Sequence, residues 1–190
     1  RMRLRRELQR LTLMHFDFSK NHFELFGLPP AFQIDMERLD KAYREIQTLV
    51  HPDKFAHLGE QDKRLSMQWA THANEAYQTL KKPLSRARYL LHLHGVDTQE
   101  ESNTAMPAEF LMAQMEWREA IMEAKEAQDI SDMEQLHNRL RSEMREQHQE
   151  LGRLLDEKAD YQGASGLVRK LKFMEKLGEE IDTALEMMEA

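Results

Sequence analysis

The fold is decided by residues 35–59, which read DMERLDKAYREIQTLVHPDKFAHLG. In the first part of this stretch apolar side chains recur at the spacing of one helix face, at Leu39, Ala42, Tyr43, Ile46 and Val50. Asp35 is placed to cap the first turn of this helix, because its carboxylate can accept hydrogen bonds from free backbone N–H groups. Pro52 excludes the helical conformation at His51, so the helix is predicted to end there.

A second long helix is predicted over about 62–80. Its apolar positions again share one face: Leu65, Trp69, Ala73, Ala76, Tyr77 and Leu80. Pro83 stops this helix, and a short helix at 84–94 is closed by Gly95. The connection at 51–59 is too short and polar to be buried, so the two long helices are predicted to form an antiparallel hairpin with an exposed tip.

The second half of the chain predicts a separate helical unit. Three further helices are predicted, near 108–127, 131–157 and 164–188. Short connections, one of them marked by Gly163 and Gly166, favour an antiparallel three-helix bundle. No strand pattern competes anywhere in the sequence, so the predicted fold class is all-α.

Residues 1–19 are set apart as an N-terminal extension. They hold five Arg against two acidic residues, and they begin with Arg rather than Met. We interpret them as added or upstream-translated sequence, with a targeting or anionic-surface role as the alternative. The rest of the chain is divided into a helical-hairpin domain at 20–95, a linker at 96–107 and the bundle at 108–190.

Composition excludes several classes of protein. The 190 residues contain no Cys, which excludes disulfides, thiolate nucleophiles and cysteine-based metal sites. No apolar run approaches the roughly 18–20 residues that a membrane span needs. The net charge is −7, and residues 97–190 hold eleven basic against twenty-three acidic side chains, which repel phosphate backbones. We therefore expect no membrane and no nucleic-acid partner, and an RNA-binding alternative would have to rest on 1–19.

The most informative motif is His51-Pro52-Asp53, called here the tip triplet. Pro52 fixes the backbone so that His51 and Asp53 project from the turn, where a carboxylate can bond to an arginine of a partner. One alternative is an ordinary proline turn. Another is a His/Asp acid–base pair, but no nucleophile or second carboxylate stands at a matching spacing. His92 and His94 lie two residues apart on a helix and face different sides, so they cannot chelate one metal ion.

Four sequence blocks follow one another in an informative order. They are FELFGL at 23–28, KAYR at 41–44, the tip triplet, and NEAYQTL at 74–80 followed by Pro83 and Arg86. This order resembles the J-domain, the module through which DnaJ-type proteins engage the ATPase domain of DnaK-like chaperones. The resemblance implies that the tip triplet stimulates the partner's ATP hydrolysis without performing chemistry itself.

A basic face beside the tip triplet belongs to the same resemblance. Lys41 and Arg44 are expected to steer the domain toward an acidic surface of the chaperone. Thr48 stands on this face where J-domains often carry another cation. We therefore expect weaker electrostatic docking at an unchanged location.

The helix predicted at 108–127 carries apolar residues on two sides. The core-facing side holds Phe110, Trp117, Ala120, Ile121 and Ala124. A separate sector, called here the methionine face, consists of Leu111, Met112, Met115 and Met122, and is edged by Glu116, Glu119, Glu123 and Glu126. Two apolar sides indicate that the helix packs once inside its bundle and once elsewhere. The alternative is burial of both sides between bundle neighbours, which would desolvate the glutamates at a high cost.

Phe173 points to the same conclusion from the last helix. It lies off the core stripe of that helix, among the basic residues Arg169, Lys170, Lys172 and Lys176. An exposed aromatic side chain in such surroundings is interpreted as an anchor for a protein partner.

Three blocks of the sequence resemble the HscB family, the J-type co-chaperones of iron–sulfur cluster assembly. They are RARYLL at 86–91, FLMAQMEWRE at 110–119 and VRKLKF at 168–173, and the resemblance extends over about 22–188. It implies that the J-domain stimulates a DnaK-like chaperone, HscA, while the C-terminal domain carries the cluster scaffold IscU. The scaffold-binding residues that it implies are Leu111, Met112, Met115, Glu116, Glu119, Glu123 and Phe173.

We therefore expect an adaptor protein rather than an enzyme, with no cofactor and no bound metal. The alternative is a general J-domain co-chaperone with a different client. Eukaryotic relatives often carry an N-terminal cysteine module, and its absence favours the bacterial cytoplasm over the mitochondrial matrix.

Overall fold

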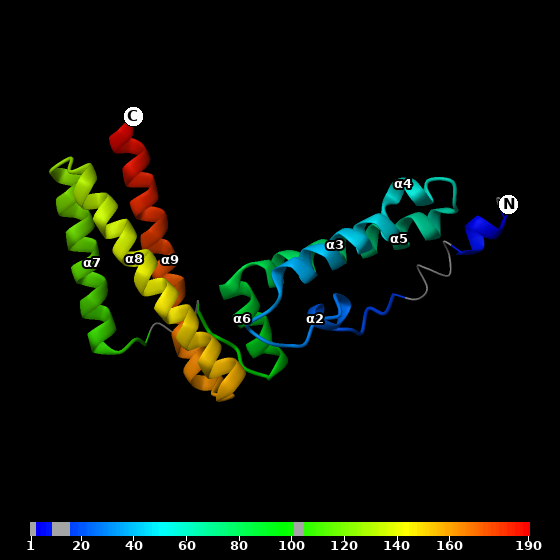
Figure 1. Cartoon of the computed structure of the whole chain (residues 1–190), viewed down its shortest axis with the longest axis horizontal. Helices are drawn as coiled ribbons and strands as arrows, with labels where there is room; N and C mark the ends of the chain where they lie inside the picture. Colours follow the sequence, from blue (N-terminus) through cyan, green and yellow to red (C-terminus); the bar gives the residue numbers. More distant parts are fainter. Residues whose placement is uncertain (1–2, 9–15, 101–104) are drawn as a thin grey trace. The chain divides into compact units, whose positions relative to one another are not determined.

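The structure is a computed structural model that describes residues 3–8, 16–100 and 105–190 (Figure 1). The chain divides into two compact units, Arg1–Tyr89 and Leu90–Ala190. Within the described residues the regular structure is entirely helical, which confirms the all-α prediction. The first unit holds α2 (His22–Leu25), α3 (Met36–Val50), α4 (Pro52–Phe55) and α5 (Glu60–Lys81), and α6 (Pro83–Leu93) continues from it into the second. The second unit holds α7 (Ala108–Glu126), α8 (Ile130–Gly152), the π-helix η1 (Arg153–Glu157) and α9 (Tyr161–Glu189).

Helices α3 and α5 form the predicted antiparallel hairpin (Figure 1). The Asp35 carboxylate caps α3 by accepting hydrogen bonds from the backbone N–H groups of Glu37 and Arg38, at 3.0 and 3.2 Å. The facing apolar stripes are buried: Leu39, Ile46 and Val50 on α3, and Trp69, Ala73, Ala76 and Leu80 on α5. Burial of these two stripes is what stabilises the hairpin.

A pair of tyrosines packs at the edge of this interface. The rings of Tyr43 on α3 and Tyr77 on α5 stack at 4.1 Å with an interplanar angle of 5°. The Tyr77 hydroxyl donates to Asp40 Oδ1 at 2.7 Å, and the Tyr43 hydroxyl donates to Asn74 Oδ1 at 3.1 Å. The hydrogen bond to the Asp40 carboxylate raises the pKa of Tyr77, so this tyrosine remains a donor at neutral pH.

Arg86 connects the end of α5 with the loop that precedes α3. Its side chain is buried, with Nε donating to the Phe32 carbonyl at 2.6 Å and Nη1 to the Leu80 carbonyl at 2.7 Å. The guanidinium also lies 5.1 Å from the centre of the Phe32 ring. One side chain thus fixes the end of α5 to the segment that leads into α3.

The last residues of the N-terminal segment pack on the hairpin. The Phe18 ring stacks on Trp69 with centroids 3.9 Å apart, and the Phe16 ring lies 4.7 Å from the same indole. This contact differs from the expectation that all of 1–19 forms a separate extension. Residues 1, 2 and 9–15 of that segment lie outside the described residues.

The second unit is a bundle in which α7, α8 and α9 pack on one another (Figure 1). The buried positions follow one face of each helix: Met133, Leu136, Leu140, Leu151 and Leu155 on α8 and η1, and Leu167, Leu171, Met174 and Ile181 on α9. Trp117, Ile121 and Ala124 bury the core side of α7. Caps by Asp129 and Asp160 begin α8 and α9.

Two boundaries in this unit differ from the prediction. The α-helical part of the predicted 131–157 helix ends at Gly152, and its last turn is the π-helix η1. Helix α9 begins at Tyr161, so Gly163 and Gly166 lie inside the helix. The prediction that they mark a connection between helices is therefore wrong. The Asp160 carboxylate accepts a hydrogen bond from the Gly163 N–H at 2.9 Å, and a Cβ at position 163 would collide with that carboxylate. The glycine therefore permits the cap and does not end a helix.

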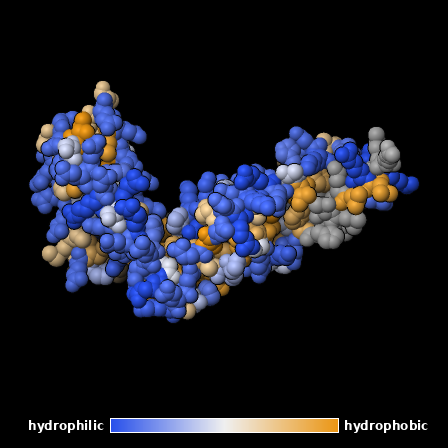
Figure 2. All heavy atoms as spheres, in the orientation of Figure 1, coloured by the Kyte–Doolittle hydropathy of each residue, from blue (hydrophilic) through white to orange (hydrophobic). Residues whose placement is uncertain are grey.

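Hydrophilic side chains cover most of the molecular face seen in Figure 2. Across the described ranges, none of the helices is both long and apolar enough to cross a membrane.

The N-terminal unit contains a half-buried histidine that packs on two other rings. The His22 ring stacks on Tyr89 at 4.2 Å and meets the edge of His72 at 5.8 Å. Its Nδ1 atom is buried without a hydrogen-bond partner in the described part of the chain. Burial lowers the pKa of His22 below its ordinary 6.5, and His72 lowers it further, while Glu75 opposes the shift.

This pKa predicts that acid destabilises the N-terminal unit. Because the folded state disfavours protonated His22, the free energy of unfolding is at its full value above pH 6.5 and declines as the pH falls through the lowered pKa. We expect His22→Phe, which keeps the stack on Tyr89, to reduce this decline in urea titrations between pH 7.5 and pH 5. The exposed His57→Phe variant should retain the full decline. Equal pH slopes for all three proteins would contradict the assignment.

Candidate functional site

The tip triplet lies where α3 gives way to α4. His51 has φ −59° and ψ 127°, the extended conformation that the following proline requires, and Pro52 occupies the first position of α4. The backbone N–H of Lys54 donates to the His51 carbonyl at 3.0 Å and closes the turn. The side chains of His51 and Asp53 are 57% and 92% exposed, so both are accessible to a partner.

The two polar side chains of the tip are close to each other. His51 Nδ1 accepts a hydrogen bond from the Asp53 backbone N–H at 3.3 Å and lies 3.7 Å from Asp53 Oδ2. The triplet therefore presents an imidazole and a carboxylate to water.

Phe55 anchors the tip in the core of the hairpin. Its side chain is 1% exposed, although the sequence argument treated the connection at 51–59 as polar and without a helix of its own. The single turn of α4 carries Phe55 into the hairpin, where α4 packs on α5. A turn held at both ends, by Pro52 and by a buried ring, presents His51 and Asp53 in a fixed geometry.

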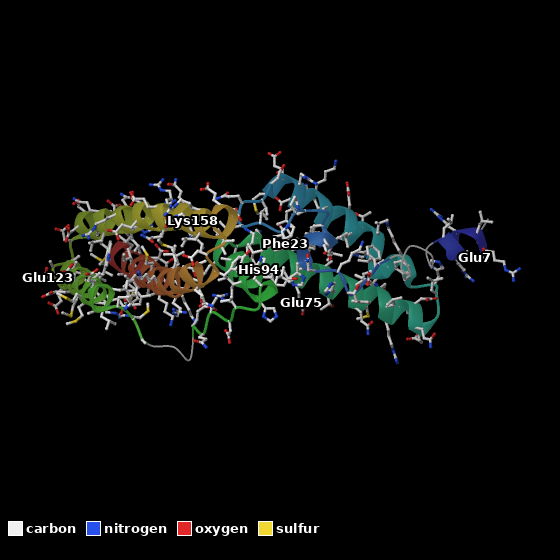
Figure 3. All side chains as sticks on the ribbon, turned by 90° about the horizontal axis from the view of Figure 1, so that it is seen from below. Glu7, Phe23, Glu75, His94, Glu123 and Lys158 are labelled. Carbon is white, nitrogen blue, oxygen red and sulfur yellow. The ribbon has the colours of Figure 1, made fainter. Side chains whose placement is uncertain are left out.

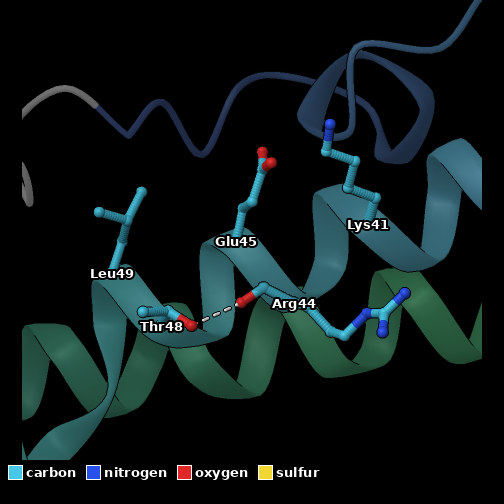
Figure 4. A pocket seen from close by; sticks show the side chains of 5 residues that line it. All are labelled: Lys41, Arg44, Glu45, Thr48 and Leu49. Atoms are coloured by element: carbon cyan, nitrogen blue, oxygen red, sulfur yellow. Dashed lines mark hydrogen bonds between the residues drawn. The ribbon is translucent and has the colours of Figure 1, made fainter.

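The basic residues singled out beside the tip line a shallow hollow on α3 of about 470 Å³ (Figure 4). Its walls are Lys41, Arg44, Glu45, Thr48 and Leu49. Lys41, Glu45 and Leu49 point the same way from the helix, and the Thr48 hydroxyl donates to the Arg44 carbonyl at 2.9 Å. The hollow thus combines two cations with one carboxylate and a leucine that is 46% exposed.

The tip triplet is more exposed than the acid–base pairs of most active sites. The His51 and Asp53 side chains are both open to water, without the low-dielectric surroundings that prepare an acid–base pair. In the part of the chain that the structure describes, no three His, Asp or Glu side chains are grouped so that they could hold a metal ion. The geometry suits contact with a protein surface.

The methionine face of α7 is open to solvent. Leu111, Met112, Met115 and Met122 are 45%, 63%, 71% and 55% exposed. Glu116, Glu119 and Glu123 are exposed beside it, and Figure 3 shows Glu123 on the outer side of the helix. The alternative in which bundle neighbours bury both sides of this helix is therefore wrong. A contiguous apolar surface edged by carboxylates is typical of a docking site.

Phe173 reaches this region from α9, but it is half-buried and not the isolated exposed ring that the sequence argument described. Its ring meets Phe110 edge to face at 5.7 Å and lies 5.4 Å from the Arg118 guanidinium. Arg118 also forms an ion pair with Glu180 at 3.3 Å. Phe173 and Phe110 together support the start of α7, from which Leu111 and Met112 project.

Comparison with known proteins addresses the identity of the chain. Residues 106–182 match the family model described as the HSCB C-terminal oligomerisation domain. A co-chaperone protein HscB homolog from Azoarcus sp. (strain BH72) is 53% identical over 176 residues, which cover 93% of this chain and 99% of that protein. The chain belongs to the HscB family of co-chaperones.

Solved structures of the family extend the match to the whole fold. Chaperone HscB from Vibrio cholerae superposes with a TM-score of 0.80 at 35% identity, covering 89% of this chain and 99% of that one. Human co-chaperone protein HscB gives a TM-score of 0.83 at 29% identity, covering 88% of this chain and 83% of that one. The hairpin unit is accordingly the J-domain of an HscB family member, and α7 to α9 form its C-terminal helical domain.

Several residues of the α3 hollow and of the contact between α7 and α9 were not identified as functional from the sequence. Glu45 and Leu49 lie one and two turns beyond Lys41 on α3, so the helical period could have placed them beside it. Phe110 was assigned to the core, yet it is half-buried and supports Phe173. Arg118 carried no signal, because its contacts with Phe173 and Glu180 depend on how α7 meets α9.

The burial of Phe55 predicts that the tip has a structural residue distinct from its exposed ones. Phe55→Ala should lower the free energy of unfolding by about 3 kcal/mol or more, because it removes a fully buried ring from the hairpin. His51→Gln, which alters an exposed side chain, should change it by less than about 0.5 kcal/mol. Urea denaturation checks both values. A Phe55→Ala variant as stable as the native chain would show that α4 is not anchored through this ring.

Proposed function

We propose that this HscB family member is an adaptor that binds the iron–sulfur scaffold IscU, delivers it to the DnaK-like chaperone HscA and stimulates the ATPase of that chaperone. The observation that carries the proposal is the exposed, doubly anchored tip triplet beside the hollow of α3. Relatives that share about half of their residues with this chain come from bacteria, which is consistent with action in the bacterial cytoplasm.

The tip triplet and the α3 hollow are proposed as the chaperone-binding site. Asp53 is the carboxylate of the turn, its side chain is 92% exposed, and it can form a charge-assisted hydrogen bond with an arginine of the chaperone. Lys41 and Arg44 contribute the cations that steer the encounter, although Glu45 in the same hollow offsets part of their charge. Leu49 offers apolar contact at the same place, so binding need not rest on charge alone.

The methionine face and its edge are proposed as the scaffold-binding site. Leu111, Met112 and Met115 supply apolar area that the bundle itself leaves exposed. Methionine side chains adapt to the shape of a partner, and the carboxylates of Glu116, Glu119 and Glu123 can set its orientation through basic groups. Phe173 contributes by holding Phe110 and the start of α7.

Stimulation of the chaperone should depend on the imidazole at the tip. We expect His51→Gln to reduce stimulation of HscA ATP hydrolysis by at least tenfold, since the variant loses the ring that the fixed turn presents to the partner. Affinity for IscU and helical content should stay unchanged. The matched control is His57→Gln, an exposed histidine of the same connection outside the triplet, which should stimulate normally. Normal stimulation by the His51 variant would contradict the proposed role of the tip.

Scaffold binding should depend on the methionine face. Combining Leu111→Ala with Met115→Ala should weaken IscU binding by about tenfold or more, since it removes two exposed apolar side chains from the proposed interface. The melting temperature should hardly change. Met187→Ala removes a methionine that is 67% exposed on α9 and should leave the affinity unchanged. Unaltered scaffold affinity of the double variant, measured by calorimetry, would place the interface elsewhere.

A further inference from the structure

Methionine is the oxidisable sulfur residue of this protein. The sequence holds thirteen Met and no Cys, so a peroxide finds thioethers but no thiol. The described methionines differ widely in exposure. Met133 and Met174 are 0% and 8% exposed in the bundle core, whereas Met112, Met115 and Met122 are 55% or more exposed on α7. Access of an oxidant therefore differs strongly between the core and the methionine face.

The three exposed methionines lie on the surface proposed above as the scaffold-binding site. Met115 follows Met112 by about one turn of α7 and Met122 follows Met115 by about two turns, so all three lie on one side of the helix. Leu111 is the apolar neighbour on this side that peroxide leaves unchanged. A modification confined to the accessible methionines would thus change most of the face and none of the buried core.

We propose that Met112, Met115 and Met122 form a reversible oxidation site that switches off scaffold docking. This inference rests on the proposed scaffold-binding function of the methionine face. Hydrogen peroxide transfers one oxygen atom to the thioether sulfur: an S–O bond forms, the O–O bond breaks, and the second oxygen leaves as water. The sulfur loses two electrons and the peroxide gains them, while every carbon–sulfur bond persists. A thiol-dependent methionine sulfoxide reductase supplies the two electrons that restore the thioether.

The surroundings of the face explain why a sulfoxide is not tolerated in the docked state. A sulfoxide oxygen is a polar acceptor, and burying it against a partner without a donor is unfavourable. The side chains that edge the face, Glu116, Glu119 and Glu123, are themselves acceptors when ionised and offer no donor. The nearby Arg118 is engaged with Glu180 and with the Phe173 ring. Oxidation therefore places unmatched polar groups where the interface requires apolar ones.

The test is to oxidise the full-length chain with hydrogen peroxide, remove the oxidant with catalase, and only then add IscU. Peptide mass spectrometry should find Met112, Met115 and Met122 oxidised while Met133 and Met174 remain reduced. Calorimetry should show scaffold affinity reduced about tenfold or more, and reductase with dithiothreitol should restore it. Circular dichroism should show an unchanged melting temperature, as expected for a modification on the surface.

Matched variants separate this site from other exposed methionines. In a triple variant with Met112→Leu, Met115→Leu and Met122→Leu, peroxide should change scaffold affinity by less than about twofold relative to the same variant untreated. A variant with Met67→Leu and Met187→Leu removes methionines that are 58% and 67% exposed outside the face, and peroxide should weaken its binding as in the native chain.

Two results would overturn the inference alone: an oxidised native chain that binds as tightly as the untreated one, or an equal loss of affinity in the triple variant. An untreated native chain that fails to bind IscU would instead overturn the proposed function, and this inference with it.

Discussion

Pro52 is the constraint on which the hairpin and its tip depend. A proline at the first position of a helix loses no intrahelical hydrogen bond, and it forces the preceding residue into an extended conformation, so one residue both ends α3 and begins α4. The single turn that follows carries Phe55 into the core. His51 and Asp53 remain outside because the chain is fixed on either side of them. The rigidity of the tip is therefore a property of the backbone and of one buried ring.

In the bundle, the two sides of the single helix α7 have different roles. One side of α7 buries Trp117 and Ile121 against its neighbours, and the other side exposes the methionine face. Both proposed docking surfaces thus consist of residues that the packing of their own unit does not require. This separation explains why variants at either surface are expected to alter binding while sparing the fold. It also leaves the thioethers of α7 open to chemistry that the core methionines escape.

Sequence periodicity was sufficient for the long helices, because the stripes of α3, α5, α8 and α9 repeat over several turns. It was insufficient where a feature is shorter than the period or depends on a distant partner. Phe55 is one apolar residue in a polar connection, and Gly163 resembles a turn residue until the Asp160 cap is seen. The burial of Phe173 against Phe110 depends on how α9 meets α7, which a single helical wheel does not contain.

The central claim is that one chain must carry both docking surfaces at once. It is tested most directly by mixing two variants, one altered only at His51 and one altered only at Leu111 and Met115, and measuring the initial rate at which HscA captures IscU in the presence of ATP. The account predicts that the mixture is no faster than either variant alone, because neither molecule can hold the scaffold and engage the chaperone together. Capture at the rate of the unaltered chain would contradict it, since the two surfaces would then act without being joined.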